Sequence, residues 1–186
     1  MNALILSSSP NRDGLTAACV DAVRTGLTAG GVDAHEVRLT EANVGVCRQC
    51  SNGWGTCLGD HVCQVSDGFQ AVHALARDAA ALILVTPVYW GDLSESAKAF
   101  VDRLRRCEAT HGDQSPLCGR WFMGVAAAGG SGGGQISCLE QMERLIGHIR
   151  MKRWDLIPLC RWTREAKLHA IQSSADGLAR AVQEEE

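Results

Sequence analysis

Two short apolar runs constrain the fold of this chain most. Residues 3–6 read Ala-Leu-Ile-Leu, and residues 81–86 read Ala-Leu-Ile-Leu-Val-Thr, with no polar residue at every second position. A strand that is apolar on both faces needs cover on both faces, which is the situation of a central strand in a parallel sheet. The sequence therefore predicts an α/β domain built around these two strands.

Helical and strand patterns alternate with these runs along the rest of the chain. The predicted helices span residues 15–28, 67–79, 94–107, 136–149 and 164–186, and the further predicted strands span residues 32–39, 121–126 and 154–159. Short connections and right-handed crossovers then predict a doubly wound parallel sheet of five strands in the order 2-1-3-4-5, which is flavodoxin-like. We expect a single domain over residues 1–186, with one irregular insertion, residues 40–66, after the second strand.

Charge and hydropathy exclude several classes of partner. The net charge of −3 gives no electrostatic reason to expect nucleic acid or an anionic membrane as a partner. No segment has transmembrane length, and the N-terminus lacks the features of a signal peptide. We therefore expect a cytoplasmic protein with reduced thiols, in which nine cysteines favour metal or redox chemistry over a disulfide framework.

Four of the cysteines lie within seventeen residues of the insertion, at Cys47, Cys50, Cys57 and Cys63. Thiolates gathered so closely suggest an iron–sulfur cluster, a zinc site, a redox pair or the remnant of one of these. The other five cysteines are scattered singly and are expected to be small buried hydrophobic residues, namely Cys19, Cys107, Cys118, Cys138 and Cys160.

Three loops are expected to meet at one edge of the predicted sheet. Residues 7–16 offer hydroxyls, amides and a helix N-terminus to a monophosphate, without the lysine or glycine spacing of nucleotide-binding loops. Residues 86–91 bring two aromatic side chains, and the glycine-rich residues 127–134 allow close approach of the backbone. Each loop alone could be an ordinary turn. Together they follow adjacent strands and suggest a site for a phosphate-bearing flat ring such as FMN.

At these loops the chain resembles the NADPH-dependent FMN reductases and the iron–sulfur flavoproteins. The resemblance rests on Ser8-Ser9-Pro10 with Gly14 and Thr16, on Thr86-Pro87-Val88-Tyr89-Trp90 followed by Ser96-x-Lys98-x-Phe100-x-Asp102-Arg103, and on Cys47-x-x-Cys50 with Cys63 before Asp67. It covers most of residues 1–135. It implies a flavodoxin-like fold, noncovalent FMN, and a homodimer or homotetramer with the flavin near a subunit interface.

The resemblance also implies a set of cofactor-binding residues. The phosphate would be held by Ser9, Asn11, Arg12, Leu15 and Thr16; the flavin ring and ribityl chain would be bordered by Pro87, Val88, Tyr89, Trp90 and Gly91; and the far side would be closed by Ala128, Gly129, Gly130 and Gly133. Tyr89 would be the local proton donor.

The cysteine spacing departs from that of the iron–sulfur members. Their third cysteine would fall at Gly53, whereas Cys57 lies four residues later. We still favour a [4Fe–4S] cluster on Cys47, Cys50, Cys57 and Cys63 over no metal, and no metal over zinc, because four thiolates on one flexible loop can encircle a cluster.

The function expected from these residues is an FMN-dependent oxidoreductase. It would pass electrons from NAD(P)H to a small acceptor such as a quinone, or to a redox protein through the cluster. One alternative is an iron–sulfur flavoprotein electron carrier with little turnover of its own. A second is a zinc-stapled, non-enzymatic binding module with a vestigial flavin site.

Overall fold

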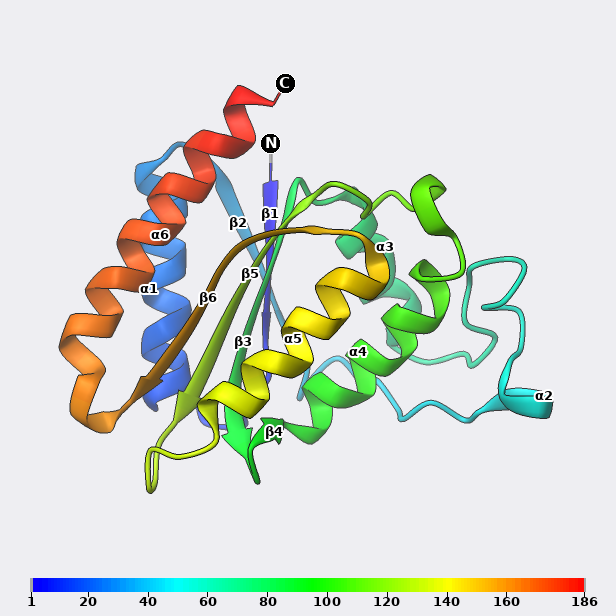
Figure 1. The fold of residues 1–186 in the computed structure, drawn as a ribbon, viewed down its shortest axis with the longest axis horizontal. Helices are drawn as coiled ribbons and strands as arrows, with labels where there is room; N and C mark the ends of the chain where they lie inside the picture. Colours follow the sequence, from blue (N-terminus) through cyan, green and yellow to red (C-terminus); the bar gives the residue numbers. More distant parts are fainter. Residues whose placement is uncertain (1, 186) are drawn as a thin grey trace.

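A central sheet covered by helices on both faces organises the chain (Figure 1). The computed structural model describes residues 2–185. Its strands are β1 (Asn2–Ser7), β2 (Asp33–Arg38), β3 (Ala81–Tyr89), β4 (Asp92–Leu93), β5 (Trp121–Ala128) and β6 (Lys152–Cys160). Its helices are α1 (Leu15–Ala29), α2 (Cys50–Gly53), α3 (Phe69–Asp78), α4 (Glu95–Glu108), α5 (Gln135–Ile149) and α6 (Arg164–Glu184), with short 3₁₀ turns at Gly112–Gln114 and Arg161–Thr163.

The strand order is β2-β1-β3-β5-β6, and all of these neighbours are parallel. β5 and β6 are the fourth and fifth strands of the sequence prediction, so the predicted flavodoxin-like order is confirmed. The short strand β4 was not predicted. It pairs antiparallel with the end of β3, through Val88 with Leu93 and Tyr89 with Asp92.

The two continuous apolar runs form the centre of the sheet, as their pattern predicts. Ile5 and Ile83 pack beneath α1 and α6 on one face, while Leu4 and Leu82 pack beneath α3, α4 and α5 on the other. Figure 1 shows these two helical layers on opposite sides of the strands. Each central strand therefore has two buried faces, and polar residues are excluded from both.

Helices α1 and α6 pack closely because α1 carries a glycine at their crossing. An ideal Cβ placed on Gly26 would lie 2.2 Å from the carbonyl oxygen of Gln172 and 2.7 Å from the Cβ of Ala175. Both contacts are too short for any side chain larger than hydrogen. The crossing therefore depends on the missing side chain.

We expect Gly26→Ala to destabilise the protein by about 1–3 kcal/mol, because overpacking forces the two helices apart. The effect should appear although alanine favours a helix over glycine by about 1 kcal/mol. Urea denaturation of the two proteins measures the difference, with the exposed Thr28→Ala on the same helix as control. A Gly26→Ala protein as stable as the parent would contradict the packing argument.

The predicted aromatic loop, residues 86–91, is mostly strand. β3 continues to Tyr89, and a two-residue turn of Trp90 and Gly91 joins it to β4. Both turn residues have positive φ, 53° and 77°, as a type I′ hairpin turn requires. A tryptophan is rare in this conformation, so the usual asparagine–glycine signal of such a turn is missing from the sequence.

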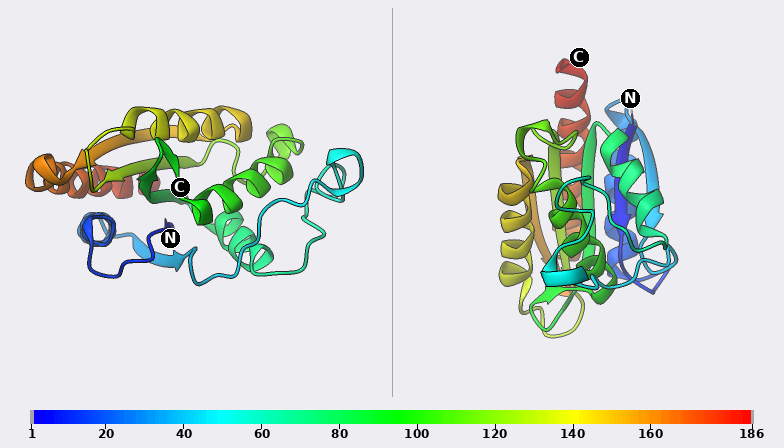
Figure 2. Two further views of the ribbon diagram at one scale, coloured as in Figure 1. Left: turned by 90° about the horizontal axis from the view of Figure 1, so that it is seen from below. Right: turned by 90° about the vertical axis from the view of Figure 1, so that its right-hand side faces the viewer.

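The insertion over residues 40–66 is irregular apart from the four residues of α2. It projects beyond α3 and α4 at the end of the molecule, as Figure 1 and the left view of Figure 2 show. Of the scattered cysteines, Cys19, Cys107, Cys138 and Cys160 are buried as predicted, whereas Cys118 is only half-buried, so that prediction was wrong for Cys118.

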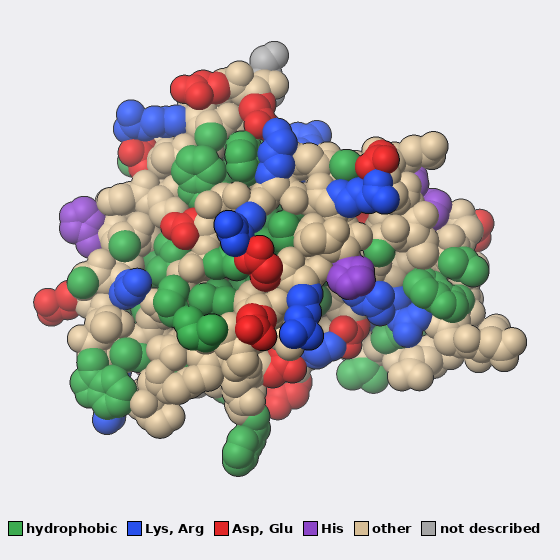
Figure 3. All heavy atoms as spheres, viewed as in Figure 1, with side chains coloured by type: hydrophobic (Ala, Val, Ile, Leu, Met, Phe, Trp, Pro, Cys, Tyr) green, Lys and Arg blue, Asp and Glu red, His purple; other side chains and the backbone are tan. Residues whose placement is uncertain are grey.

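None of the helices described between residues 2 and 185 is long and apolar enough to cross a membrane. On the face viewed in Figure 3, acidic and basic side chains are intermingled over α4 and α5 and form no field of one sign.

Candidate functional site

The loop after β1 is fixed to the N-terminus of α4. The backbone N–H of Ser8 donates to the carbonyl oxygen of Val85 in β3 at 3.2 Å. The hydroxyls of Ser94 and Ser96 both donate to the carbonyl oxygen of Ser8, at 3.2 and 3.3 Å. Ser94 also caps α4 by accepting from the amide of Ala97. Sequence reasoning did not assign Ser94 or Ser96 a role in the site, although the capping position of Ser94 was a usable signal.

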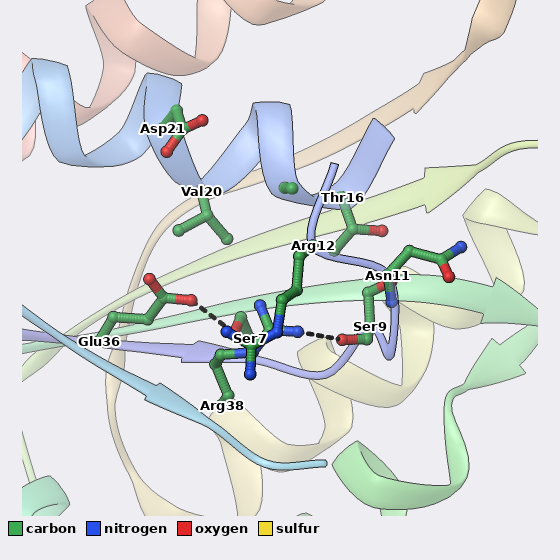
Figure 4. Close-up of a pocket in the computed structure, with 10 residues that line it drawn as sticks. Ser7, Ser9, Asn11, Arg12, Thr16, Val20, Asp21, Glu36 and Arg38 are labelled. Atoms are coloured by element: carbon green, nitrogen blue, oxygen red, sulfur yellow. Dashed lines mark hydrogen bonds between the residues drawn. The ribbon is translucent and has the colours of Figure 1, made fainter. Parts of the chain in front are cut away.

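The same loop borders a cavity of about 80 Å³ between α1 and β2 (Figure 4). Four of the five predicted phosphate-binding residues line it, namely Ser9, Asn11, Arg12 and Thr16, whereas Leu15 does not. Helix α1 begins at this cavity, and within residues 2–185 no side chain caps its N-terminus. Its first amides and the positive end of its dipole are therefore free to meet an anion.

Two arginines share one carboxylate at the rim of this cavity. Arg12 Nη2 lies 2.6 Å from Glu41 Oε1, and Arg38 Nε lies 2.8 Å from the same oxygen. Arg38 Nη2 also donates to the carbonyl oxygen of Ser9 at 3.1 Å, and Figure 4 shows Arg12 and Arg38 extending toward each other. One carboxylate thus bridges two guanidinium groups beside the loop, while Asp21 and Glu36 line the far side of the same cavity.

The roles of Arg38 and Glu41 were missed from the sequence. Their signal was the pairing of β1 with β2, because Arg38 is the in-register partner of Ser7 and so ends its strand beside the loop.

A second cavity, of about 340 Å³, lies between the β3–β4 hairpin and the glycine-rich loop after β5. The predicted residues that line it are Val88, Trp90, Gly91, Ala128, Gly129, Gly130 and Gly133. Pro87 and Tyr89 are not among its lining residues. A Cβ added to Gly129 or Gly130 would meet no described atom within 4 Å, so backbone forms this wall of an open recess.

The hairpin and the glycine-rich loop are in direct contact. The hydroxyl of Ser137 donates to the carbonyl oxygen of Gly91 at 2.7 Å. An ideal Cβ on Gly134, which has φ +81°, would lie 2.7 Å from the Cα of Gly91. The sheet order puts the β1 loop between the two cavities, since the first lies beside β2 and the second between β3 and β5.

All four clustered cysteines line one further cavity, on the α4 side of the insertion. Cys47, Cys50, Cys57 and Cys63 are joined there by a fifth cysteine, Cys107. Within residues 2–185, no three His, Cys, Asp or Glu side chains converge closely enough to hold one metal ion. The thiols therefore form no preformed tetrahedral zinc site, in which each sulfur would be about 2.3 Å from the metal.

The cysteine cavity is also small. Its volume of about 20 Å³ corresponds to about one water molecule. Cys47 and Cys50 are only half-buried, and Arg48 and Gln49 beside them are exposed. A group larger than one ion would enter by outward movement of this surface segment.

Arginines, rather than acids, accompany the thiols. Arg48, Arg103 and Arg106 line the cavity, and no aspartate or glutamate is among the described residues that do so. The Nε of Arg103 is buried and has no hydrogen-bond acceptor among residues 2–185. An unpaired buried donor costs about 1–3 kcal/mol, so this wall is suited to an anionic acceptor. In its donors and charge, the residue set fits a thiolate-ligated iron–sulfur cluster.

Comparison with known proteins identifies the chain. The family model described as NADPH-dependent FMN reductase matches residues 1–154. The chain belongs to the NADPH-dependent FMN reductase family. The cofactor in the family's name fits the recess and the free N-terminus of α1, which offer open space for a ring and amides for a phosphate.

Two curated relatives carry the name iron–sulfur flavoprotein, and both come from Archaeoglobus fulgidus. One is 24% identical over 161 residues, 86% of this chain and 66% of the relative. The other is 29% identical over 99 residues, 53% of this chain and 48% of the relative. The FMN reductase family member described here thus spans only about half to two-thirds of their lengths.

The fold has many solved counterparts. An NAD(P)H:quinone oxidoreductase from Methanothermobacter marburgensis superposes with a TM-score of 0.69 at 19% identity, covering 96% of each chain. At this identity the similarity establishes the shared flavodoxin-like fold.

In this family member the cysteine loop is anchored by an ion pair. Burial alone raises the pKa of Asp67, but hydrogen bonds from Arg103 and from the amides of Phe69 and Gly45 outweigh it, and the pKa lies below its usual value. The carboxylate therefore stays charged beside Arg103, with Nη1 and Oδ2 2.7 Å apart.

Cys107 is the cavity residue that sequence reasoning took for core alone. Burial raises the pKa of its thiol to about 12, and the neighbouring Cys57 and Cys63 act in the same direction. Helical spacing could have placed Cys107 at this cavity, because Arg103, Arg106 and Cys107 share one face of α4.

A second buried charge lies behind this face. The carboxylate of Glu108 is fully buried and accepts hydrogen bonds from His73 and Ser115. Burial alone raises the pKa of Glu108, but these hydrogen bonds outweigh it, and the pKa lies below the usual 4.5. The ionised carboxylate thus joins α3, α4 and the turn that follows α4.

We expect the free energy of unfolding to fall as the pH drops from about 4.5 through the lower pKa of folded Glu108. In that window only the unfolded chain takes up a proton at this carboxyl, so stability is lost toward acid, by at most about 1.4 kcal/mol per pH unit. Urea denaturation from about pH 3 to about pH 7 should show a flatter profile for Glu108→Gln. The exposed Glu140→Gln serves as control, and parallel profiles for all three proteins would refute the assignment.

Proposed function

We propose that this chain is an FMN-dependent oxidoreductase that passes electrons from NAD(P)H to a small acceptor such as a quinone. The observation that carries the proposal is the backbone-walled recess between Gly91 and the glycine-rich loop, next to a helix N-terminus without a side-chain cap. It is supported by membership of the FMN reductase family.

Each loop at this edge of the sheet contributes a different part of the proposed FMN site. Ser9, Asn11 and Thr16 bind the phosphate together with the first amides of α1. Val88 and Trp90 border the flat ring, while the glycine-rich backbone limits access of water from the other side. When bound, FMN supplies the hydride acceptor and the return of electrons. The amides of the glycine-rich loop would stabilise negative charge on the ring.

The cysteine cavity extends the proposal to a second redox group. A [4Fe–4S] cluster held by Cys47, Cys50, Cys57 and Cys63 would let electrons leave one at a time, toward a redox protein. The support is the common cavity of the four thiols and the name iron–sulfur flavoprotein of the two relatives. An electron carrier with little turnover is the second candidate function, and the same cavity favours it.

Trp90 further suggests a homo-oligomer. Its side chain is 105% exposed although its backbone has positive φ, an arrangement of about 1 kcal/mol strain that glycine or asparagine would avoid. In Figure 3 a hydrophobic group projects from the bottom of the molecule, where Figure 1, in the same view, places the β3–β4 hairpin. We propose that a second copy of the chain covers it beside the flavin.

Anaerobic reconstitution with FMN, iron and sulfide tests the proposals of a flavin enzyme and of an electron carrier. Flavin binding with rapid NADPH oxidation in the presence of a quinone supports the enzyme. Flavin binding with an iron–sulfur shoulder that bleaches on reduction, but slow turnover, supports the carrier. A protein that binds no FMN refutes both.

A further inference from the structure

The guanidinium of Arg103 is the group most closely integrated with the cysteine loop. The side chain is 1% exposed, on the face of α4 that lines the cavity. Its Nη1 donates to the carbonyl oxygen of Gly45 at 3.0 Å, and its Nη2 donates to that of Val65 at 3.1 Å. One side chain thus holds both ends of the segment that carries the four cysteines.

The same guanidinium contacts a thiol directly. Arg103 Nη2 donates to Cys63 Sγ at 3.3 Å. Arg103 Cζ lies 4.3 Å from the centre of the Phe69 ring, against which the guanidinium stacks. The aromatic ring fixes the plane of the guanidinium, and the carboxylate of Asp67 fixes its rotation. Arg103 therefore holds the thiol of Cys63, while Gln70 holds its backbone by donating to its carbonyl oxygen.

One donor of Arg103 is still unused. Its Nε is buried without an acceptor among the described residues, although the other nitrogens make four hydrogen bonds in all. An anionic sulfur group in the cavity would supply that acceptor.

The charged side chains that line the cavity are all basic. Arg48, Arg103 and Arg106 line it, and the nearest carboxylate that the hydrogen bonds identify, Asp67, is paired with Arg103. Arg48 is exposed and Arg106 half-buried, so water and salt screen them more than they screen the fully buried Arg103. A positive charge near an iron–sulfur cluster favours its reduced, more negative form and so raises its reduction potential.

We infer that Arg103 is the positioning residue of the cysteine site: it holds Cys63 in place and raises the reduction potential of an iron–sulfur cluster bound there. The inference rests on the proposed function, because it assumes that the cavity takes a cluster. It assigns to α4, rather than to the loop, the control of the redox group.

Paired substitutions of opposite electrostatic sign distinguish this role from a merely structural one. Arg103→Gln removes the positive charge and should shift the midpoint potential downward. Asp67→Asn removes the balancing carboxylate, keeps an acceptor for the helix amide, and should shift the potential upward. Both changes loosen the same contact, so a structural role would move both variants in the same direction.

Arg105→Gln is the matched control, because it makes the same charge change on the same helix and lines a different cavity. Arg103→Lys, which keeps the charge and loses the forked geometry, should retain the potential better than Arg103→Gln and bind less iron than the parent. Arg103→Lys replaces Arg103→Gln in the test if circular dichroism of the apoprotein shows that Arg103→Gln does not fold.

The measurements are bound iron and sulfide, and the midpoint potential from an anaerobic dye-mediated titration followed by electron paramagnetic resonance. Opposite shifts in Arg103→Gln and Asp67→Asn, with Arg105→Gln unchanged, support the inference. Shifts of the same sign, or none, overturn it while leaving the cluster proposal intact. A parent protein that binds no iron overturns the cluster proposal itself.

Discussion

Cys50→Ser is expected to abolish iron binding by the reconstituted protein. Cys50 begins the short helix α2 and lines the cavity shared by all four clustered thiols. A serine hydroxyl does not supply the soft thiolate that iron–sulfur clusters select. The fifth cysteine of the cavity, Cys107, is a poor replacement because burial raises the pKa of its thiol to about 12. Iron and sulfide analysis, together with the visible absorption, measures the loss.

The control for this prediction is Cys118→Ser, a half-buried cysteine outside the cavity, which should keep the iron of the parent. FMN content should also persist in Cys50→Ser, because the flavin recess and the cysteine cavity share no lining residue. Full retention of iron in Cys50→Ser would eliminate the four-thiolate site.

Cys57→Ser answers the question raised by the spacing. Gly53 occupies the position of the third cysteine in the strict motif, and it has φ +94° with no described atom near its would-be Cβ. Cys57, by contrast, is buried at the cavity wall. Loss of iron in Cys57→Ser would establish the later cysteine as the ligand in this chain.

The sheet could be predicted because its signals are local. Each central strand is an unbroken apolar run, and every connection except the insertion over residues 40–66 is short enough to leave one simple strand order. The hairpin at Trp90 was not predicted because tryptophan is rare at positive φ. The turn is held by the hydrogen bond from Ser137 to the carbonyl oxygen of Gly91. That contact joins residues 46 positions apart, which no local pattern contains.

The candidate site was predictable in its residue types and less so in its partners. The spacing of the cysteines indicated a common site, and the structure gathers them around one cavity. Arg103 and Cys107, however, lie on helix α4, and Arg103 follows Cys63 by 40 positions. In the sequence both resemble ordinary amphipathic positions. Long-range contacts decide which face of α4 meets the loop, so their roles emerge only in the fold.

Thr16→Leu is expected to release FMN while the fold stays intact. Thr16 is buried at the first turn of α1, between the free amides and the cavity beside Ser9 and Asn11. Leucine replaces the hydroxyl with a larger apolar group at the proposed phosphate site. The isosteric Thr16→Val should weaken the binding of FMN by about 10–100-fold, since a hydrogen bond to a charged group contributes about 1.5–3 kcal/mol. Thr16→Leu adds steric exclusion to that loss.

Fluorescence titration of the apoprotein with FMN measures both variants, and Thr28→Val, exposed at the other end of α1, controls for the loss of a threonine from this helix. Riboflavin separates the phosphate from the ring: it lacks the phosphate, so its weaker binding should be nearly the same in the parent and in Thr16→Val. If Thr16→Val weakens riboflavin and FMN equally, Thr16 acts on the ring or the fold, and the β1 loop is not the phosphate site. If only FMN is affected, the free N-terminus of α1 and the hydroxyl of Thr16 bind the phosphate together.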